Sequence, residues 1–164
     1  MSKVILITGA SSGIGKAIGD FLCNKNFKVY GTSRDPSKYL GSNFQLFDLN
    51  VNSSASINKC IDEIIKIEGG IDVLINNAGV GITGPLEEIP EIEIENNFKT
   101  NFFGPLNIIK KILPFMRSKK SGLIINITSL AAYVGTPYRS VYSASKAALD
   151  LVSEPLNMET KPFN

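Results

Sequence analysis

Three glycines follow directly on a short apolar run near the start of the chain, and this arrangement limits the choice of fold more than any other feature. Gly9, Gly13 and Gly15 come after the run at residues 4–7 and open a stretch in which apolar residues recur with helical spacing. The pattern predicts a buried strand, a tight turn and a helix in immediate succession. Strand–turn–helix units of this kind bind the pyrophosphate of a dinucleotide.

The residues of the turn have the types that such a site needs. Gly9 can form the tight turn, Gly13 lets the backbone approach the pyrophosphate, and Gly15 lets the helix pack closely on the strand. The N-terminus of the helix presents free N–H groups to a phosphate, and the hydroxyls of Ser11 and Ser12 can add donors. The alternative is a bare turn between a strand and a helix.

A phosphate loop of the NTPase type is the obvious rival, because Lys16 follows Gly15 directly. That loop requires a glycine where Ala10 stands and a serine or threonine where Ala17 stands, the latter as a magnesium ligand. Both are absent, and the sequence therefore excludes the NTPase interpretation.

Apolar runs alternate with longer amphipathic stretches along the rest of the chain. Further strands are expected at residues 27–32, 44–47, 71–75 and 123–127, and helices at 54–68, 91–117 and 138–160. Strands separated by helices of this length imply parallel crossovers. The expected fold class is α/β, a doubly wound parallel sheet with helices on both faces. Pro155 lies inside the last helix, where we expect a kink or fraying.

The composition excludes several classes of function. There is no histidine, and Cys23 and Cys60 are not in Cys-x-x-Cys spacing, so we predict no metal site and no Ser-His triad. A net charge of +2 without a concentrated basic face predicts no nucleic-acid partner. The first apolar run is too short for a membrane span and lacks a signal-peptide cleavage pattern. Both cysteines are interpreted as buried hydrophobes in a reducing compartment, so the expected location is cytoplasmic.

Three motifs together resemble those of the short-chain dehydrogenase/reductase family. They are Thr8-Gly9-x-x-x-Gly13-Ile14-Gly15, Asn76-Asn77-Ala78-Gly79 and Tyr142-Ser143-Ala144-Ser145-Lys146. Their order and spacing are similar to those of the family from residue 3 to the end of the chain. The resemblance implies one dinucleotide-binding domain over residues 1–164. It also implies that the chain is truncated after the helix that carries Tyr142 and Lys146, so that the final strands are missing.

The residues after the second and third strands indicate the cofactor. NAD enzymes of this type usually have an acidic residue at the end of the second strand, whereas this chain has Ser33 followed by Arg34. A guanidinium and a hydroxyl can hold a 2′-phosphate there, which predicts NADP(H) in preference to NAD(H). The alternative is a solvated arginine in a turn. The resemblance adds contacts near the adenine from Asp48 and Leu49, although Asp48 is also a common turn residue, and contacts near the ribose from Asn77, Ala78 and Gly79.

The resemblance also implies a catalytic set made of Asn101, Ser129, Tyr142 and Lys146. Tyr142 and Lys146 are four residues apart on a predicted helix and share a face, and Ser129 follows the fifth strand. In the family the serine and tyrosine hold the substrate oxygen, the lysine holds the nicotinamide ribose, and the asparagine supports a water linked to the lysine. A neighbouring ammonium favours a tyrosinate, which suits Tyr142 to proton exchange. Ser145, like Ser143, is interpreted as a small packing residue.

These assignments predict an oxidoreductase that interconverts a ketone or aldehyde and an alcohol by hydride transfer, with Tyr142 as proton donor or acceptor. The segments 80–86 and 130–137 would flank the pocket and are mostly apolar, which favours a hydrophobic small-molecule substrate. The resemblance implies a homo-oligomer formed through two long helices. Because the strands beside the nicotinamide are missing, the alternative is a catalytically inactive nucleotide-binding fragment with a structural or regulatory role.

Overall fold

A computed structural model describes residues 2–39 and 41–163 of the chain. Its core is a single five-stranded sheet with the strand order β3-β2-β1-β4-β5, and all neighbouring strands are parallel. The strands are β1 (Val4–Ile7), β2 (Lys28–Ser33), β3 (Gln45–Asp48), β4 (Val73–Asn76) and β5 (Leu123–Asn126). β1 has the predicted bounds, and the ends of the other strands differ by at most two residues from those that the sequence predicts.

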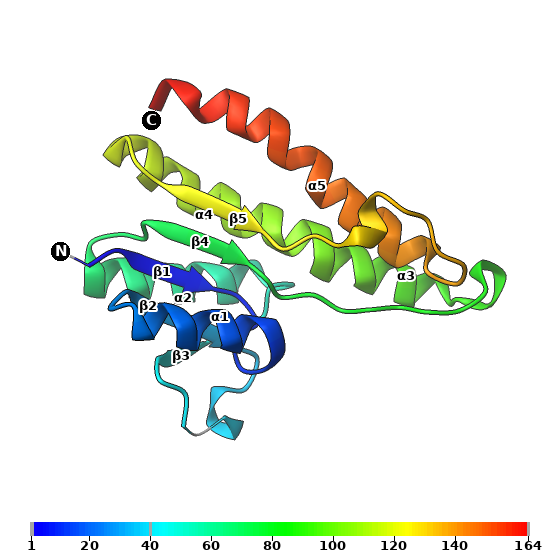
Figure 1. Ribbon diagram of the computed structural model, residues 1–164, viewed down its shortest axis with the longest axis horizontal. Helices are drawn as coiled ribbons and strands as arrows, with labels where there is room; N and C mark the ends of the chain where they lie inside the picture. Colours follow the sequence, from blue (N-terminus) through cyan, green and yellow to red (C-terminus); the bar gives the residue numbers. More distant parts are fainter. Residues whose placement is uncertain (1, 40, 164) are drawn as a thin grey trace.

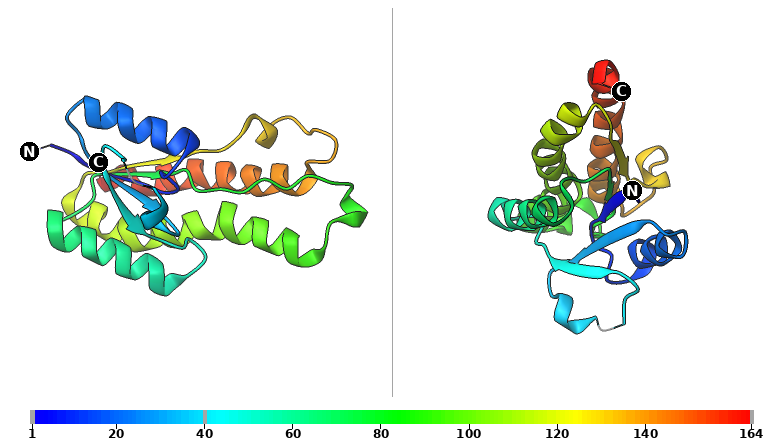
Figure 2. Two further views of the ribbon diagram at one scale, coloured as in Figure 1. Left: turned by 90° about the horizontal axis from the view of Figure 1, so that it is seen from below. Right: turned by 90° about the vertical axis from the view of Figure 1, so that its left-hand side faces the viewer.

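Helices cover both faces of the sheet, which confirms the predicted doubly wound fold (Figures 1 and 2). Ile5 and Ile7 of β1 face α1, whereas Leu6 faces the cluster that contains apolar residues of α2 and α4. In Figure 2, α1 lies on the opposite side of the sheet from α2 and α4. The α-helices are α1 (Gly13–Asn24), α2 (Ser54–Glu68), α3 (Glu91–Phe98), α4 (Gly104–Lys119) and α5 (Ser140–Thr160).

The contact between α1 and the sheet is close because glycines line it. Phe44 lies between Gly19 of α1 and Gly31 of β2, and a Cβ atom on either glycine would overlap the Phe44 ring. Phe44 itself is buried and belongs to the core on the α1 face of the sheet. The aromatic ring therefore sets the distance between α1 and β2.

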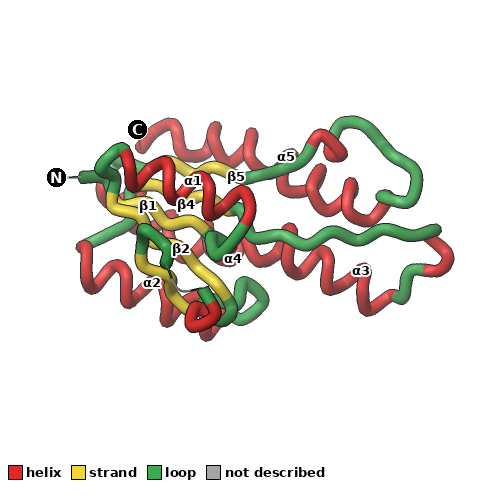
Figure 3. The backbone as a smooth tube through the Cα atoms, turned by 60° about the horizontal axis from the view of Figure 1, so that its bottom comes forward, coloured by secondary structure: helices red, strands yellow, loops and turns green. Residues whose placement is uncertain are grey.

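The strand order reverses between β1 and β4, and the loops that follow these two strands lie at the same edge of the sheet. Crevices at such a reversal are where open α/β sheets bind their ligands. The loop after β4 runs out from the sheet toward α3 (Figure 3). It also contacts the segment before α5, since the Gly84 N–H donates to the Tyr138 carbonyl at 3.0 Å.

The helices depart from the prediction at two places. The single helix expected over residues 91–117 is divided into α3 and α4 by a π-helix, Lys99–Phe103, whose wider turn carries Asn101 into the interior. The helix α5 continues past Pro155 to Thr160, without the expected fraying. Pro155 and Leu151 are both on the exposed side of α5, so the carbonyl that loses its partner can bind water.

Candidate active site

The turn after β1 is packed so closely that two of its glycines have no room for a side chain. A Cβ on Gly9 would lie 2.9 Å from the Cα of Ala78, and one on Gly15 would overlap the side-chain amide of Asn77. Gly9 also has a φ of 65°, a left-handed conformation that residues with a side chain rarely adopt. The turn is therefore held against the segment that follows β4.

Hydrogen bonds from Thr8 and Asn77 fix this contact. The Thr8 hydroxyl oxygen accepts from the N–H groups of Asn77 and Ala78, both at 3.0 Å. The Asn77 amide donates to the carbonyls of Thr8 at 2.9 Å and Gly9 at 3.0 Å. Asn77 and Ala78 thus brace the glycine turn from behind. This role of the Thr8 hydroxyl is not among the roles that the sequence predicts.

Gly13 is unlike the other two glycines because it faces open space. It has a φ of 55°, and no atom lies within 4 Å of the position that a Cβ would take. Ser12 beside it makes no side-chain capping bond to α1, and the first turn of α1 carries no acidic residue. The Lys16 ammonium binds Asp20 at 2.5 Å, one turn further along the helix. The space in front of α1 is therefore open, and the N–H groups of a helix N-terminus there are suited to an anion.

Ser33 and Arg34 lie together at the end of β2. Ser33 is buried and accepts a hydrogen bond from the Asp35 N–H at 3.2 Å. Arg34 is exposed, and among residues 2–39 and 41–163 it has no carboxylate within salt-bridge distance. Asp35 is instead paired with Lys38 at 3.0 Å. The guanidinium of Arg34 is thus available to an external anion.

Asp48 is the last residue of β3 and Leu49 follows it, but the two residues differ in exposure. Asp48 pairs with Ser33 in the sheet register and is exposed. Leu49 is buried in the core, and its N–H donates to the Ser33 carbonyl at 2.9 Å. Of the two predicted adenine contacts, the Asp48 carboxylate is the one whose side chain is open to a ligand.

The π-helix places Asn101 at the centre of a hydrogen-bond network. Its Oδ1 accepts from the Val80 N–H at 2.8 Å, and its Nδ2 donates to the Val80 carbonyl at 2.9 Å. The same Nδ2 is 3.0 Å from the Ser145 hydroxyl. Asn97, one turn earlier, donates to the Val80 carbonyl at 3.0 Å. Two buried amides therefore clamp the loop after β4 and connect it to α5.

Lys146 is buried where the segments after β4 and β5 meet. Its exposed fraction is 5%, and its ammonium donates to the Ile127 carbonyl at 2.8 Å. A Cβ on Gly79 would lie 3.3 Å from the same ammonium, so Gly79 leaves the space beside it open. Burial lowers the pKa of Lys146, because a low-dielectric environment disfavours the charged form.

Tyr142 and Ser129 flank the same region from α5 and from the segment after β5. Tyr142 lies one turn before Lys146 and is half-buried. The Ser129 oxygen accepts from the Ala131 N–H at 3.1 Å and so caps a short 3-10 turn, Leu130–Ala132. The hydroxyl proton of Ser129 remains available for donation to a ligand.

Ser145 has a role that the packing interpretation missed. It is fully buried, and its hydroxyl bonds both to the Asn101 amide and, as a donor at 2.8 Å, to the Tyr142 carbonyl. Its partner Asn101 is 44 residues away along the chain, so no local sequence pattern points to the contact. Ser143, in contrast, makes no side-chain hydrogen bond within the described part of the chain.

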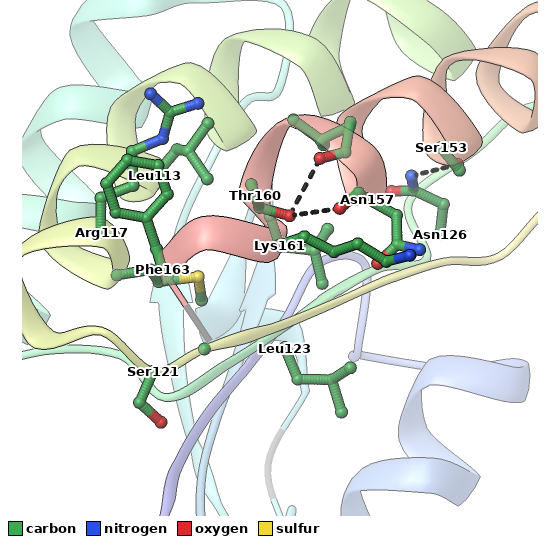
Figure 4. Close-up of a pocket in the computed structure, with 14 residues that line it drawn as sticks. Leu113, Arg117, Ser121, Leu123, Asn126, Ser153, Asn157, Thr160, Lys161 and Phe163 are labelled. Carbon is green, nitrogen blue, oxygen red and sulfur yellow. Dashed lines mark hydrogen bonds between the residues drawn. The ribbon is translucent and has the colours of Figure 1, made fainter.

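A cavity between α4, α5 and β5 lies away from these side chains. Its volume is about 270 Å³, and it is enclosed by the C-terminal parts of α4 and α5 and by β5 (Figure 4). Asn126 lines it and donates to the Ser153 hydroxyl at 2.9 Å, while Arg117 stacks on Phe163 at its rim. The cavity borders the open edge of β5, where Leu123 and Ile125 are exposed. None of the predicted catalytic residues lines it.

Residues 3–164 match the model of a family described as short chain dehydrogenase. The chain is 46% identical over 162 residues to 3-ketodihydrosphingosine reductase of Bacteroides thetaiotaomicron, covering 99% of this chain and 60% of the relative. It is 36% identical over 175 residues to human retinol dehydrogenase 8, covering 99% and 55%. The chain therefore spans less than two thirds of the length of these relatives.

Solved structures give the same result. A metagenomic short-chain oxidoreductase in complex with NADP has a TM-score of 0.92 and 30% identity, and the match covers 98% of this chain and 76% of that one. An NAD+-bound xylitol dehydrogenase has a TM-score of 0.90 and 24% identity, over 99% and 66% of the two chains, which shows the shared fold. No helix among the residues described here is both long and apolar enough to cross a membrane.

Proposed function

The chain belongs to the short-chain dehydrogenase family, and from this premise we propose that it interconverts a ketone or aldehyde and an alcohol with NADP(H) as the cofactor. The observation that carries the proposal is the burial of Lys146. Its ammonium lies beside Gly79 and donates to the Ile127 carbonyl, and the preceding residue, Ser145, is hydrogen-bonded to Asn101. A desolvated cation at the strand ends of an α/β sheet is typical of a functional site.

The residues of the glycine turn would hold the cofactor by its pyrophosphate. The open space at Gly13 and the free N–H groups of α1 support this placement. Ser11, Ser12 and Ile14 border the same space, and Lys146 and Tyr142 would contact the nicotinamide half beyond Gly79. When bound, the cofactor supplies the hydride for the carbonyl carbon.

Tyr142 and Ser129 act on the substrate oxygen. In reduction, Tyr142 donates the proton that converts the carbonyl oxygen into a hydroxyl, and in oxidation it accepts that proton. Ser129 donates a hydrogen bond to the oxygen while negative charge develops on it. Lys146 stabilises the phenolate that Tyr142 leaves behind, since a nearby positive charge favours the anion.

The choice of NADP(H) over NAD(H) rests on Arg34 and Ser33. The exposed guanidinium, which pairs with no carboxylate of the described residues, and the adjacent hydroxyl can bind a 2′-phosphate. In addition, β2 ends without a carboxylate that could hold a ribose diol. Calorimetric titration with NADPH and NADH tests this choice. We expect NADPH to bind at least about tenfold more tightly, because one charge-assisted hydrogen bond contributes about 1.5–3 kcal/mol. Equal affinities would exclude the role of Arg34.

The proposed substrate is hydrophobic. Leu130, Tyr133, Val134 and Tyr138 expose more than half of their surface beside the catalytic residues, and Val80 is 41% exposed. The substrates named for the two relatives, 3-ketodihydrosphingosine and retinol, support an extended apolar molecule. The assay is NADPH consumption with aliphatic ketones of increasing chain length. The expected result is a rise in kcat/KM with chain length.

We also infer that the protein works in the cytoplasm as a homo-oligomer. The two described cysteines are free, and burial raises the pKa of Cys60 to about 12, which keeps it unreactive. Phe103 and Phe115 of α4 and Leu151 and Met158 of α5 are exposed, which supports contacts between copies through these helices. Light scattering of the purified protein measures the oligomeric state.

A second candidate function is nucleotide binding without turnover. The observation that favours it is the open edge of β5, together with the exposure of the apolar residues around Ser129. NADPH binding in calorimetry without NADPH consumption on any ketone would support this second candidate. Absence of binding would exclude both candidates.

A further inference from the structure

Arg139 immediately precedes α5, the helix that carries the proposed catalytic residues Tyr142 and Lys146. Arg139, Tyr142 and Lys146 are spaced by three and four residues, so they follow one another along one side of the helix start. The Arg139 guanidinium carbon is 5.6 Å from the centre of the Tyr142 ring. Arg139 therefore supplies a second cation one turn before Tyr142, whereas Lys146 lies one turn after it.

The loop after β4 lies beside both Lys146 and Arg139. Gly79 lies beside the Lys146 ammonium, and a Cβ on Gly81 would lie 4.0 Å from the Nη1 of Arg139. Between them, Val80 is clamped by Asn101 and by Asn97. The cofactor end of the site is therefore at Lys146 and Gly79, and Arg139 and Gly81 border the opposite, substrate end.

The backbone conformation before α5 determines the position of Arg139 beside Tyr142. Tyr138 has a φ of 63°, a conformation that is strained for a residue with a large side chain. Its carbonyl accepts from the Gly84 N–H at 3.0 Å, which ties the start of α5 to the loop after β4. The strained residue directs the chain so that Arg139, which immediately precedes α5, lies beside Tyr142.

The guanidinium is free to bind an external group. In the described part of the chain, no carboxylate lies within salt-bridge distance of Arg139 and no side-chain hydrogen bond from its guanidinium is present. The guanidinium lies near the Tyr142 ring and Gly81. The exposed residues of the segment before α5, Leu130, Val134 and Tyr138, are apolar or aromatic. In such surroundings the N–H donors of the guanidinium favour a ligand that offers an acceptor oxygen.

From this geometry, and on the basis of the proposed function, we infer that Arg139 determines substrate specificity. Its guanidinium binds an oxygen atom carried by the carbon next to the reacting carbonyl. That oxygen belongs to a hydroxyl or to a carboxylate, and the rest of the substrate is apolar. The substrate class is thus an aliphatic ketone that carries an oxygen function beside its carbonyl group.

Three ketones of equal chain length test the inference: octan-2-one, 1-hydroxyoctan-2-one and 2-oxooctanoate. The wild-type protein is expected to prefer the two oxygen-bearing ketones. The Arg139→Met variant should lose about 10- to 100-fold in kcat/KM on at least one of them, because a hydrogen bond to a charged donor is lost, and less than about threefold on octan-2-one. Arg139→Lys, which keeps the charge without the guanidinium, should recover part of the loss on 2-oxooctanoate. The oxygen-bearing ketone that loses activity identifies the acceptor.

The control is Arg117→Met, which changes an arginine at the rim of the remote cavity. It should leave the preference among the three ketones unchanged. An equal loss on all three ketones in Arg139→Met, or no preference in the wild type, would overturn the inference while leaving the proposed reduction intact. If no ketone is turned over, the proposed function fails. Calorimetric binding of the three ketones to the NADPH-saturated protein then still decides the role of Arg139.

Discussion

The side-chain amide of Asn101 lies 3.0 Å from the hydroxyl of Ser145, one residue before Lys146 on α5. This bond joins the π-helix to α5, and the other bonds of Asn101 hold the backbone of Val80. The position of the Lys146 ammonium beside Gly79 therefore depends on a buried amide from a distant part of the chain.

Replacement of Asn101 by alanine should lower both stability and activity. The Val80 N–H and the Ser145 hydroxyl lose a partner, which costs about 1–3 kcal/mol of unfolding free energy. Chemical denaturation measures this change, and the matched control is Asn107→Ala at an exposed position of α4. If both variants unfold at the same denaturant concentration as the wild type, the network does not stabilise the fold.

The packing of Phe44 predicts a second effect. Gly31→Ala should destabilise the protein by about 1–3 kcal/mol, because the new methyl group must displace the Phe44 ring between α1 and β2. Gly135 is the control, since a Cβ there meets nothing within 4 Å and its backbone is not left-handed. Thermal unfolding should separate the two variants, and a Gly31→Ala variant as stable as Gly135→Ala would contradict the packing account.

A substitution at Gly13 tests cofactor binding separately from folding. Gly13→Ala should cost about 1–2 kcal/mol of stability through its positive φ, since no atom obstructs the methyl group. Its main effect should be on NADPH, because the methyl group fills the space in front of α1 that the pyrophosphate would occupy. Calorimetry should show at least about a tenfold loss of affinity in a variant that remains folded. Unchanged affinity would place the pyrophosphate elsewhere.

The ionisation of Tyr30 should make the unfolding free energy depend on pH in the alkaline range. Burial, together with its hydrogen bond to Glu68, raises the pKa of Tyr30 from 10.0 to about 12. The folded state therefore holds the tyrosine proton more tightly than the unfolded state does. The resulting stabilisation is complete below pH 10 and is lost as the pH rises toward about 12. The difference in unfolding free energy between wild type and Tyr30→Phe should shrink over this range, and a constant difference would refute the linkage.

The protonation of Glu68 should lower the unfolding free energy as the pH falls into the acidic range. Hydrogen bonds from Lys28 and from Tyr30 lower the pKa of Glu68. Its contribution is present above the pKa of an unfolded glutamate and is lost as the pH falls through the lowered folded value. Glu68→Gln should therefore be less stable than the wild type at neutral pH and approach it in acid. Parallel stability curves for the two proteins would contradict this assignment.

The sequence predicts the fold well because local patterns determine it. Apolar runs mark β1, β4 and β5, partly polar runs mark β2 and β3, and the glycines after β1 mark the turn against Ala78 and Asn77. The π-helix is not predictable in this way, since Asn101 is turned inward by bonds to Val80 and Ser145, which are distant in sequence. The continuity of α5 past Pro155 depends on solvent exposure, which the sequence alone does not give.

The candidate site is predicted in part. Motif spacing places Tyr142, Lys146 and Ser129 at the carboxyl edge of the sheet, where the structure has them. Spacing does not reveal the bracing by Thr8 or the contact of Arg139 with Tyr142, because each depends on side-chain directions set by the assembled fold.

The central claim is that Tyr142 and Lys146 support hydride transfer from NADPH to a carbonyl group. The most direct measurement uses NADPH deuterated at the transferable position of the nicotinamide, an aliphatic ketone, and mass spectrometry of the alcohol. The account predicts that deuterium appears on the carbinol carbon, and that Tyr142→Phe lowers the rate by at least about a hundredfold, the usual effect of losing a general acid. A wild-type protein that binds NADPH but transfers no deuterium, or a Tyr142→Phe variant as fast as the wild type, would contradict it.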